Sequence, residues 1–322
     1  MAETEFLSGK REIISIGKES TYGTAVNPTI ILGNNATWTP NNENSWLDNR
    51  GAGTGSTTQT YEISNKIVRG TLKFVPQDWM MLVFAIGQTT NTGSAPTVHT
   101  FSRKTGYTIP SFTLERKINA TTDSVRTYDG CQCNRFTIEW NAGGSGAGGT
   151  GQYVFASMDV FARDITPGTT GAGSPTNPNL AGFQARNVTL TLNSSAKTHC
   201  IRGNIVIDTH LNDGRFSYYS SSSALKGESQ MQLTTYSGEF TLHYTDNTEI
   251  DFWNNRVVVP GTNTLVFNRA TDDNLTCTFT NLRIIAASDP TNLDGFNMIT
   301  LRWVADDITF VANDINDQTY IT

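Results

Sequence analysis

The feature that most constrains the fold of this 322-residue chain is the repeated alternation of apolar and polar side chains along short segments. The clearest example is Phe136-Thr137-Ile138-Glu139-Trp140, in which every second side chain is apolar. A period of two is typical of a β-strand with one buried face and one face in water. The segments predicted as strands are 11–16, 61–68, 71–75, 111–117, 136–140, 154–161, 187–193, 204–210, 238–244, 264–267, 275–285 and 296–304. The pattern therefore predicts a mainly β protein.

Helices are predicted at only two places. Residues 76–87 begin with Pro, carry Asp78 early, continue with good helix formers and end at Gly87. These are the usual start and stop signals of a helix. Residues 246–253 form a shorter counterpart in the second half. We therefore expect one helix in each half of the chain.

The composition narrows the possible functions. The chain has 23 basic and 29 acidic residues, a net charge of −6, so it lacks the basic surface typical of nucleic-acid binding. Only 16% of residues are charged and 10% are aromatic, which argues against disorder. The longest apolar run, 79–87, is far shorter than the roughly 20 residues needed to cross a bilayer. We expect no contact with a membrane, no secretory signal, and free thiols at the four cysteines.

The two halves share an ordered set of residues. Gly70 and Gly238 are each followed by an Asp eight positions later. Further along, a Phe-Thr pair precedes Ala-x-Asp-Ile-Thr at the same distance of 26 residues, at 136–166 and again at 279–309. From the glycine to the Phe-Thr pair the first half spans 66 residues and the second 41. The pattern predicts an internal duplication, with an insertion of about 25 residues in the first copy.

A segment without apolar periodicity divides the halves. Residues 167–180 are rich in Pro, Gly and Thr, which is typical of a linker. We predict a first domain at 1–166, a linker at 167–181 and a second domain at 182–322. A repeat of this length is too long for a solenoid, whereas two similar domains in one chain suit a ring with pseudo-symmetry.

A second low-complexity segment, residues 142–151, is almost wholly Gly, Ala, Ser and Thr and lies between two predicted strands. We interpret it as a flexible arm. The glycines that are candidates for this assembly arm are Gly143, Gly144, Gly146, Gly148, Gly149 and Gly151. No Gly-Lys-Ser/Thr follows, so the segment is not a phosphate-binding loop. A third loose stretch is expected at 41–59.

No motif for catalysis is found. The four histidines lie in no catalytic pattern, and Gly143-Gly144-Ser145-Gly146 lacks the frame of a nucleophile elbow. The pair Cys131 and Cys133 has no second ligand pair at zinc spacing, and the acidic pairs at 272–273 and 306–307 lack the spacing of a calcium loop. We predict no catalytic residue, no cofactor and no metal site, and therefore no enzyme.

The opening segment Gly17-Lys18-Glu19-Ser20-Thr21-Tyr22-Gly23-Thr24-Ala25-Val26 resembles the N-terminal signature of tail tube (major tail) proteins of long-tailed bacteriophages. Further elements are similar to that family. They are Val68-Arg69-Gly70-Thr71-Leu72-Lys73-Phe74 before Gln77-Asp78-Trp79, the strand Ser111-Phe112-Thr113-Leu114-Glu115, and Tyr128-Asp129-Gly130-Cys131. The resemblance covers most of the first half and reaches the second through the internal repeat.

The resemblance implies a structural virion protein whose copies form rings that stack into a hollow tube for genome delivery. Each half would be a β-sandwich or barrel with a flanking helix, and its strands would contribute to an inner β-barrel formed by the ring. Three chains with two domains each would give a pseudo-hexameric ring, and a true hexamer is the alternative. Other tail proteins would bind the tube ends. The protein would assemble in the host cytoplasm and reside in the virion tail.

Viral DNA would pass through this tube without specific binding, because a neutral or negative lumen does not attract phosphates. Candidates for the lumen face are Glu115 and Glu139 on alternating strands, and Asp306 and Asp307. Two other functions remain open. One is a different phage structural module, either a tail terminator or an adhesive β-sandwich that binds glycans, and the other is a hydrolase with a β-sandwich fold.

Overall fold

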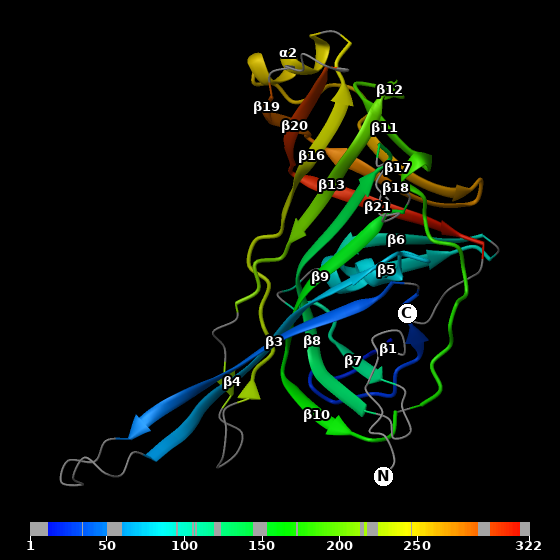
Figure 1. Cartoon of the computed structure of the whole chain (residues 1–322). Coiled ribbons are helices and arrows are strands. Elements are labelled where there is room, and N and C mark those ends of the chain that lie inside the picture. Colours follow the sequence, from blue (N-terminus) through cyan, green and yellow to red (C-terminus); the bar gives the residue numbers. More distant parts are fainter. Residues whose placement is uncertain are drawn as a thin grey trace, which may run out of the picture.

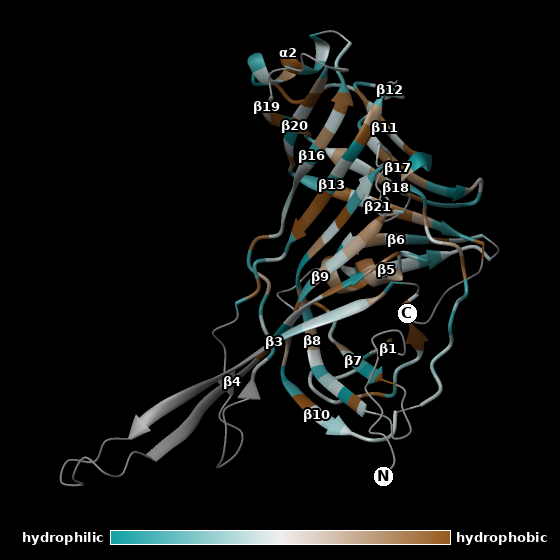
Figure 2. Cartoon of the chain, viewed as in Figure 1, coloured by the Kyte–Doolittle hydropathy of each residue, from teal (hydrophilic) through white to brown (hydrophobic). Residues whose placement is uncertain are grey.

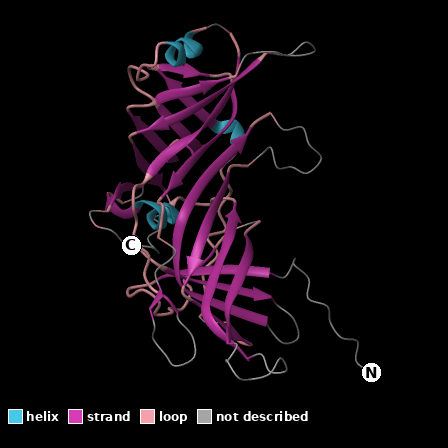
Figure 3. Cartoon of the chain, turned by 90° about the vertical axis from the view of Figure 1, so that its left-hand side faces the viewer, coloured by secondary structure: helices cyan, strands magenta, loops and turns pink. Residues whose placement is uncertain are grey.

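The computed structural model describes residues 12–33, 35–49, 60–94, 96–104, 106, 108–118, 124–143, 153–171, 173–212, 216–217, 225–245, 247–288 and 297–315. Strands dominate this part of the chain, as Figure 3 shows. The first-half strands are β1 (Glu12–Lys18), β2 (Ile30–Ile31), β3 (Thr37–Asn49), β4 (Thr60–Phe74), β5 (Gly87–Thr92), β6 (Thr97–Arg103), β7 (Phe112–Ile118), β8 (Ser124–Asn141), β9 (Phe155–Ala162) and β10 (Asp164–Gly168).

The described second-half strands have at most nine residues, and the described helices of both halves are short. The strands are β11 (Val188–Leu192), β12 (Ser195–Lys197), β13 (Cys200–Asp208), β14 (Phe216–Ser217), β15 (Leu225–Lys226), β16 (Thr235–His243), β17 (Thr264–Ala270), β18 (Asp273–Thr280), β19 (Arg283–Ala287), β20 (Met298–Ala305) and β21 (Asp307–Asp314). The helices of the described chain are η2 (Met80–Leu82) leading into α1 (Val83–Ile86), η3 (Ala185–Asn187) and α2 (Thr248–Asn254). The prediction of a mainly β protein is confirmed.

Most strands belong to two sheets, one of 12 strands and one of seven. The larger sheet contains a continuous antiparallel run in the order β3-β4-β9-β8-β13-β16-β20-β19, which we call the eight-strand run. The other half of the long strand β8 pairs with β10 and with β7, which continues to β1 and β2. The smaller sheet has the order β12-β11-β17-β18-β21-β6-β5. Figure 1 shows the hairpin of β3 and β4 extending away from the body.

The same strand order occurs in both halves of the chain. In the first half, β3-β4-β9-β8 form one ribbon and β10-β8-β7-β1-β2 form another. In the second half, β13-β16-β20-β19 and β21-β18-β17-β11-β12 have the corresponding orders. The hairpin of β5 and β6 has no counterpart in this scheme. Both junctions between the halves are antiparallel strand pairs, β8 with β13 and β6 with β21.

The core lies between the eight-strand run on one side and the smaller sheet and the ribbon of β7, β1 and β2 on the other, and it is rich in aromatic side chains. Trp140 and Trp303 of the eight-strand run pack against Phe267 and Phe279 of the smaller sheet, with ring centroids 5.5 and 5.0 Å apart. Along β8 and β13, buried apolar positions alternate with more exposed ones, and brown bands alternate with paler or teal bands in Figure 2. This alternation is the physical basis of the sheet, because one face of each strand is buried and the other is exposed.

Gly70 and Gly238 of the sequence repeat have a packing role. A Cβ atom at Gly238 would lie 2.6 Å from the Trp303 ring on the paired strand, and one at Gly70 would lie 2.7 Å from the Trp38 ring. Gly203 has the same relation to Trp140. A tryptophan on the adjacent strand therefore covers each glycine, and only glycine leaves room for the ring.

The two predicted helices are found, although the first begins later than expected. Residues 76–79 are not helical, and the helical segment covers 80–86 before Gly87, whose φ of 118° stops it. The second helix spans Thr248–Asn254.

Two strand predictions and the prediction of one loose stretch need correction. The segments 61–68 and 71–75 are one strand, β4, because the ladder to β3 and β9 continues through Gly70. The segment 275–285 is two strands, because Asn281 adopts a left-handed φ of 51° between β18 and β19. The stretch 41–59 is not wholly loose, since residues up to Asn49 belong to β3.

Candidate assembly surface

The outer face of the eight-strand run, opposite the core, is polar. On β8 the side chains of Phe136, Ile138 and Trp140 are buried, whereas Arg135 and Glu139 point to the other side. The same alternation continues on β9, where positions 156, 158, 160 and 162 are buried. The smaller sheet packs on the opposite side of the core and leaves these positions half-exposed or exposed, so most of this face is a broad polar surface.

Charged side chains on the outer face are paired across strands. The Lys73 ammonium lies 2.7 Å from the Glu139 carboxylate, and the Arg302 guanidinium lies 2.8 Å from Glu239 on the neighbouring strand. The Lys73 ammonium also lies 4.9 Å from the centre of the Phe155 ring. These side chains are about half exposed, so each pair contributes roughly 0–1 kcal/mol. Their main consequence is that neighbouring positive and negative charges on the outer face neutralise each other.

The four candidate lumen carboxylates do not lie together. Glu139 is on the outer face of the eight-strand run, and its side chain is 47% exposed. Glu115 is on β7 and only 3% exposed, so it is buried inside the chain. A carboxylate buried in a single chain cannot line a lumen, because the lumen face is in contact with water.

The other two candidates lie at the junction of β20 and β21. Asp306 accepts hydrogen bonds from Arg283 (2.6 Å) and Asn281 (2.8 Å), and these bonds lower the pKa of its carboxyl. Asp307 begins β21 and accepts a 2.9 Å hydrogen bond from the Ile308 amide. The corresponding Asp164 in the first half accepts a 2.7 Å bond from the Ile165 amide. The shared Asp-Ile-Thr therefore starts a strand in both halves.

Of the glycine-rich arm, the structure describes only its first candidate. Gly143 lies in an exposed turn after β8, and its amide donates a 3.0 Å hydrogen bond to Asn141 Oδ1. Gly144, Gly146, Gly148, Gly149 and Gly151 lie outside the described residues. A projecting arm that the sequence did not predict is the hairpin of β3 and β4 (Figure 1). The alternation of apolar and polar residues at 61–68 is the sequence pattern from which this hairpin could have been predicted.

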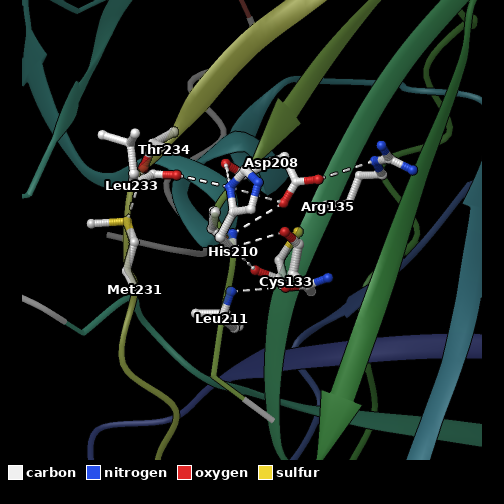
Figure 4. Close-up of polar contacts among 10 residues, drawn as sticks. Cys133, Arg135, Asp208, His210, Leu211, Met231, Leu233 and Thr234 are labelled. Atoms are coloured by element: carbon white, nitrogen blue, oxygen red, sulfur yellow. Dashed lines mark hydrogen bonds and ion pairs between the residues drawn. The ribbon is translucent and has the colours of Figure 1, made fainter.

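Strands β8 and β13 pair with each other and so connect the two halves of the eight-strand run. The Arg135 guanidinium lies 3.5 Å from the Asp208 carboxylate directly opposite (Figure 4). Just beyond, the Thr209 amide donates a 2.9 Å hydrogen bond to the Asn134 carbonyl. The Asn134 side chain accepts a 2.9 Å bond from the Leu211 amide, so the junction continues past the end of β13.

Each edge of the eight-strand run is an open strand. β3 pairs with β4 on one side and with no described strand on the other. β19 pairs with β20, and its outer side is bridged only at Arg283, by Val258, within the described residues. Beyond this bridge, Ile285 is 54% exposed. Open edges are ready to pair with another strand, and a soluble chain must either protect or use them.

The segment that carries the family resemblance is organised by one buried carboxylate. Glu19 is 5% exposed. Its Oε2 accepts hydrogen bonds from the Ser111 hydroxyl (2.7 Å) and the Gly23 amide (3.0 Å). Its Oε1 accepts them from the Thr113 hydroxyl (2.9 Å) and the Gly130 amide (2.8 Å). Glu19 thus ties the N-terminal loop to β7 and β8, which makes the signature a structural element.

The described residues contain no group of three or more His, Cys, Asp or Glu placed to hold a metal ion. All four cysteines are free, and burial raises the pKa of the Cys131 and Cys133 thiols well above the ordinary value. These thiols are poor nucleophiles, because the thiolate is the reactive form. Among the described residues there is no helix long and apolar enough to cross a membrane.

Comparison with known proteins adds to this geometry. No curated protein sequence matches the chain at a significant level. The family model described as phage tail tube protein matches residues 9–305, which is most of the chain. Proteins of this family are structural subunits of the virion tail and are not catalytic. The chain therefore belongs to the phage tail tube protein family.

Proposed function

We propose that three copies of this tail tube subunit close into a pseudo-hexameric ring, and that such rings stack into the tube through which the genome is delivered. The observation that carries the proposal is the eight-strand run with its two open edges. Each chain would add eight strands to an inner β-barrel, and pairing between chains would remove both edges. A ring of six chains is the alternative stoichiometry.

The trimer follows from two equivalent modules in each chain. The first domain is residues 1–166, the linker is 167–181 and the second domain is 182–322. The matching strand orders of the two halves support a duplication. By strand pairing, Phe136 corresponds to Ala287 and not to Phe279, which is the counterpart that the repeated Phe-Thr pair suggests.

The outer face of the eight-strand run would line the lumen, because the smaller sheet and the ribbon of β7, β1 and β2 lie on the other side of the core. The exposure of Glu139 on this face supports it as a lumen residue, whereas the burial of Glu115 in the single chain argues against Glu115. Asp306 and Asp307 would lie near a rim of the inner barrel, at the end of β20. Balanced charges would let DNA pass without the counterion release that drives binding to a basic surface.

The arms would act between rings. We expect the hairpin of β3 and β4 and the segment 142–151 to contact a neighbouring ring, and the glycine-rich sequence of that segment would allow it to order on contact. Other tail proteins would bind at the two tube ends. Assembly would take place in the host cytoplasm, before the tail joins the virion.

Electron microscopy of the purified protein at increasing concentration tests the proposal. We expect rings with a central pore, and then hollow tubes of uniform diameter with three-fold symmetry in averaged end views. A chain that stays monomeric under all conditions would contradict the tube, and six-fold averages with one chain per repeat would contradict the trimer.

The lumen assignment has its own test. Replacing Glu139 and Glu239 by Gln would leave Lys73 and Arg302 without their acidic partners. We expect tubes of this variant to bind double-stranded DNA several-fold more tightly at about 50 mM salt, and to lose that gain at high salt. The control is Asp251→Asn with Asp272→Asn, which changes the net charge equally at exposed positions elsewhere. Equal DNA binding by the two variants, measured by fluorescence anisotropy, would remove Glu139 from the lumen.

A further inference from the structure

We infer that β19 of one copy pairs with β3 of the next copy in the register in which β8 pairs with β13 inside the chain, so that Ser288 lies opposite Asn41 of the neighbour. The inference rests on the proposed ring and specifies the contact that closes it. The partner is a second copy of this chain, because the contact repeats one that the chain already makes within itself.

Strand β3 of the first half corresponds to β13 of the second half. Gly70 and Gly238 hold the same place in the sequence repeat and in the strand order. Gly70 lies opposite Pro40 on β3, and Gly238 lies opposite Ile205 on β13. Pro40 therefore corresponds to Ile205. One residue further along, Asn41 corresponds to Val206.

Strand β19 corresponds to the C-terminal part of β8. Val160 on β9 and Trp303 on β20 are equivalent, because both lie a fixed distance before the shared Asp-Ile-Thr. Val160 pairs with Cys133, and Trp303 pairs with Ile284. The position next along each ladder matches as well, with Arg135 opposite Asp159 and Ala286 opposite Arg302.

Both ladders skip one residue at this point. Asn134 is the bulged residue on β8, and Ile285 is the bulged residue on β19. A β-bulge changes strand twist and ends or redirects pairing, so the same bulge at the same place is a specific likeness. Counting on from the bulge, Thr137 corresponds to Ser288. Phe136 therefore corresponds to Ala287, and not to Phe279.

The pairing of β8 with β13 can therefore be repeated between β19 of one copy and β3 of the next. Inside the chain, Thr137 lies opposite Val206. Replacing each by its counterpart places Ser288 opposite Asn41 of the neighbouring copy. Strands alternate in direction along the whole eight-strand run, so the edges β19 and β3 are antiparallel when two copies meet. No strand has to reverse.

The surroundings of β19 permit this contact. Helix α2 lies beside β19 as α1 lies beside β8, and β8 nevertheless pairs with β13. The Ser288 amide donates inward to the Thr300 carbonyl at 2.9 Å. Because amides along a strand point alternately to the two sides, the Ala287 amide points to the open side. It would donate to the β3 backbone of the next copy.

The test mixes two single variants, Asn41→Cys and Ser288→Cys, before assembly and oxidises the tubes. In the inferred register the two cysteines form a non-hydrogen-bonded pair with Cα atoms about 4.5 Å apart, which suits a disulfide. We expect a covalent dimer on a non-reducing gel. The matched control mixes Thr39→Cys with Ser288→Cys, which keeps the same strand and face but moves the cysteine two residues out of register. We expect at least five-fold less dimer there.

A second measurement uses the unsubstituted protein. Hydrogen exchange of the Ala287 amide should slow at least ten-fold on assembly, while the Ser288 amide, already bonded within the chain, serves as the reference. Tubes that form without slowing the Ala287 amide, or that cross-link better through Thr39, would overturn the register and leave the tube intact. Absence of tubes from the unsubstituted protein would instead overturn the proposed function, and the register with it.

Discussion

Each carboxylate oxygen of Glu19 accepts two hydrogen bonds. In the Glu19→Gln variant, an NH2 group, which can only donate, takes the place of one of these oxygens. Each oxygen of Glu19 receives one backbone amide and one hydroxyl, at 2.7 to 3.0 Å. A hydroxyl can turn and accept from the new NH2 group, but the amide of Gly23 or Gly130 cannot. Either orientation of Gln therefore leaves one backbone donor without its acceptor in a site that is 5% exposed.

The magnitude follows from these contacts. A hydrogen bond to a charged acceptor contributes about 1.5–3 kcal/mol, and an unsatisfied buried donor costs about 1–3 kcal/mol. Losing one such bond, stranding one donor and weakening the others by removing the charge gives about 4 kcal/mol. For a chain of this size, each kcal/mol lowers Tm by about 2 °C, so we expect a decrease of about 8 °C.

Urea unfolding followed by tryptophan fluorescence measures the loss, and a thermal scan gives Tm. The matched control is Glu239→Gln, because Glu239 is 40% exposed and pairs only with Arg302 among the bonds described for its carboxylate. The control should lose no more than about 1 kcal/mol. If Glu19→Gln lies within about 1 kcal/mol of the unsubstituted protein, the carboxylate does not organise the signature loop and the reasoning is refuted.

Three further changes have defined outcomes. In Gly238→Ala the new methyl would meet the Asn204 carbonyl oxygen and also the Trp303 ring, at 2.6 Å, so urea unfolding should show a loss of about 1–3 kcal/mol, and an unchanged value would contradict the tight packing. In Arg269→Ala the buried Asp273 loses its partner at 2.6 Å, which should cost about 3–5 kcal/mol in the same assay; a loss below 1 kcal/mol would argue against this pair. Burial and the opposing Asp164 raise the pKa of Asp129, so the folded state loses stability as pH rises through that raised pKa. Asp129→Asn should therefore gain Tm relative to the unsubstituted protein more at pH 7.5 than at pH 4.5, and a gain independent of pH would contradict this.

Strands in which apolar and polar residues clearly alternate were predictable from the sequence. Segment 136–140 lies in β8 as expected, because its apolar side chains face the aromatic core while its polar ones face water. The two helices were found from their boundary residues, and Met80 is indeed placed by a 3.0 Å hydrogen bond from its amide to Asp78. These elements depend on local pattern, which a single sequence contains.

Elements without such a local pattern were missed or divided wrongly. Most of β3 is polar, and it is a strand because β4 pairs along its whole length. Gly70 looked like a break in the pattern, but it is required inside β4 by the Trp38 ring of the next strand. The burial of Glu115 also depends on a segment distant in the sequence, since a Cβ atom at Gly171 would lie 3.0 Å from its carboxylate, and the alternation of its own strand does not reveal this contact.

By itself the sequence determined the strand-rich composition, the low charge, the two helices and the repeated landmarks at Gly70, Gly238 and the two Asp-Ile-Thr segments. These depend on side-chain chemistry and on spacing along the chain. Only the tertiary structure decided that β8 joins β13, that a bulge recurs at Asn134 and Ile285, and that most of one face of the eight-strand run is polar and exposed. The physical reason is that strand pairing is made by backbone groups common to all residues, so the choice of partner depends on the whole fold.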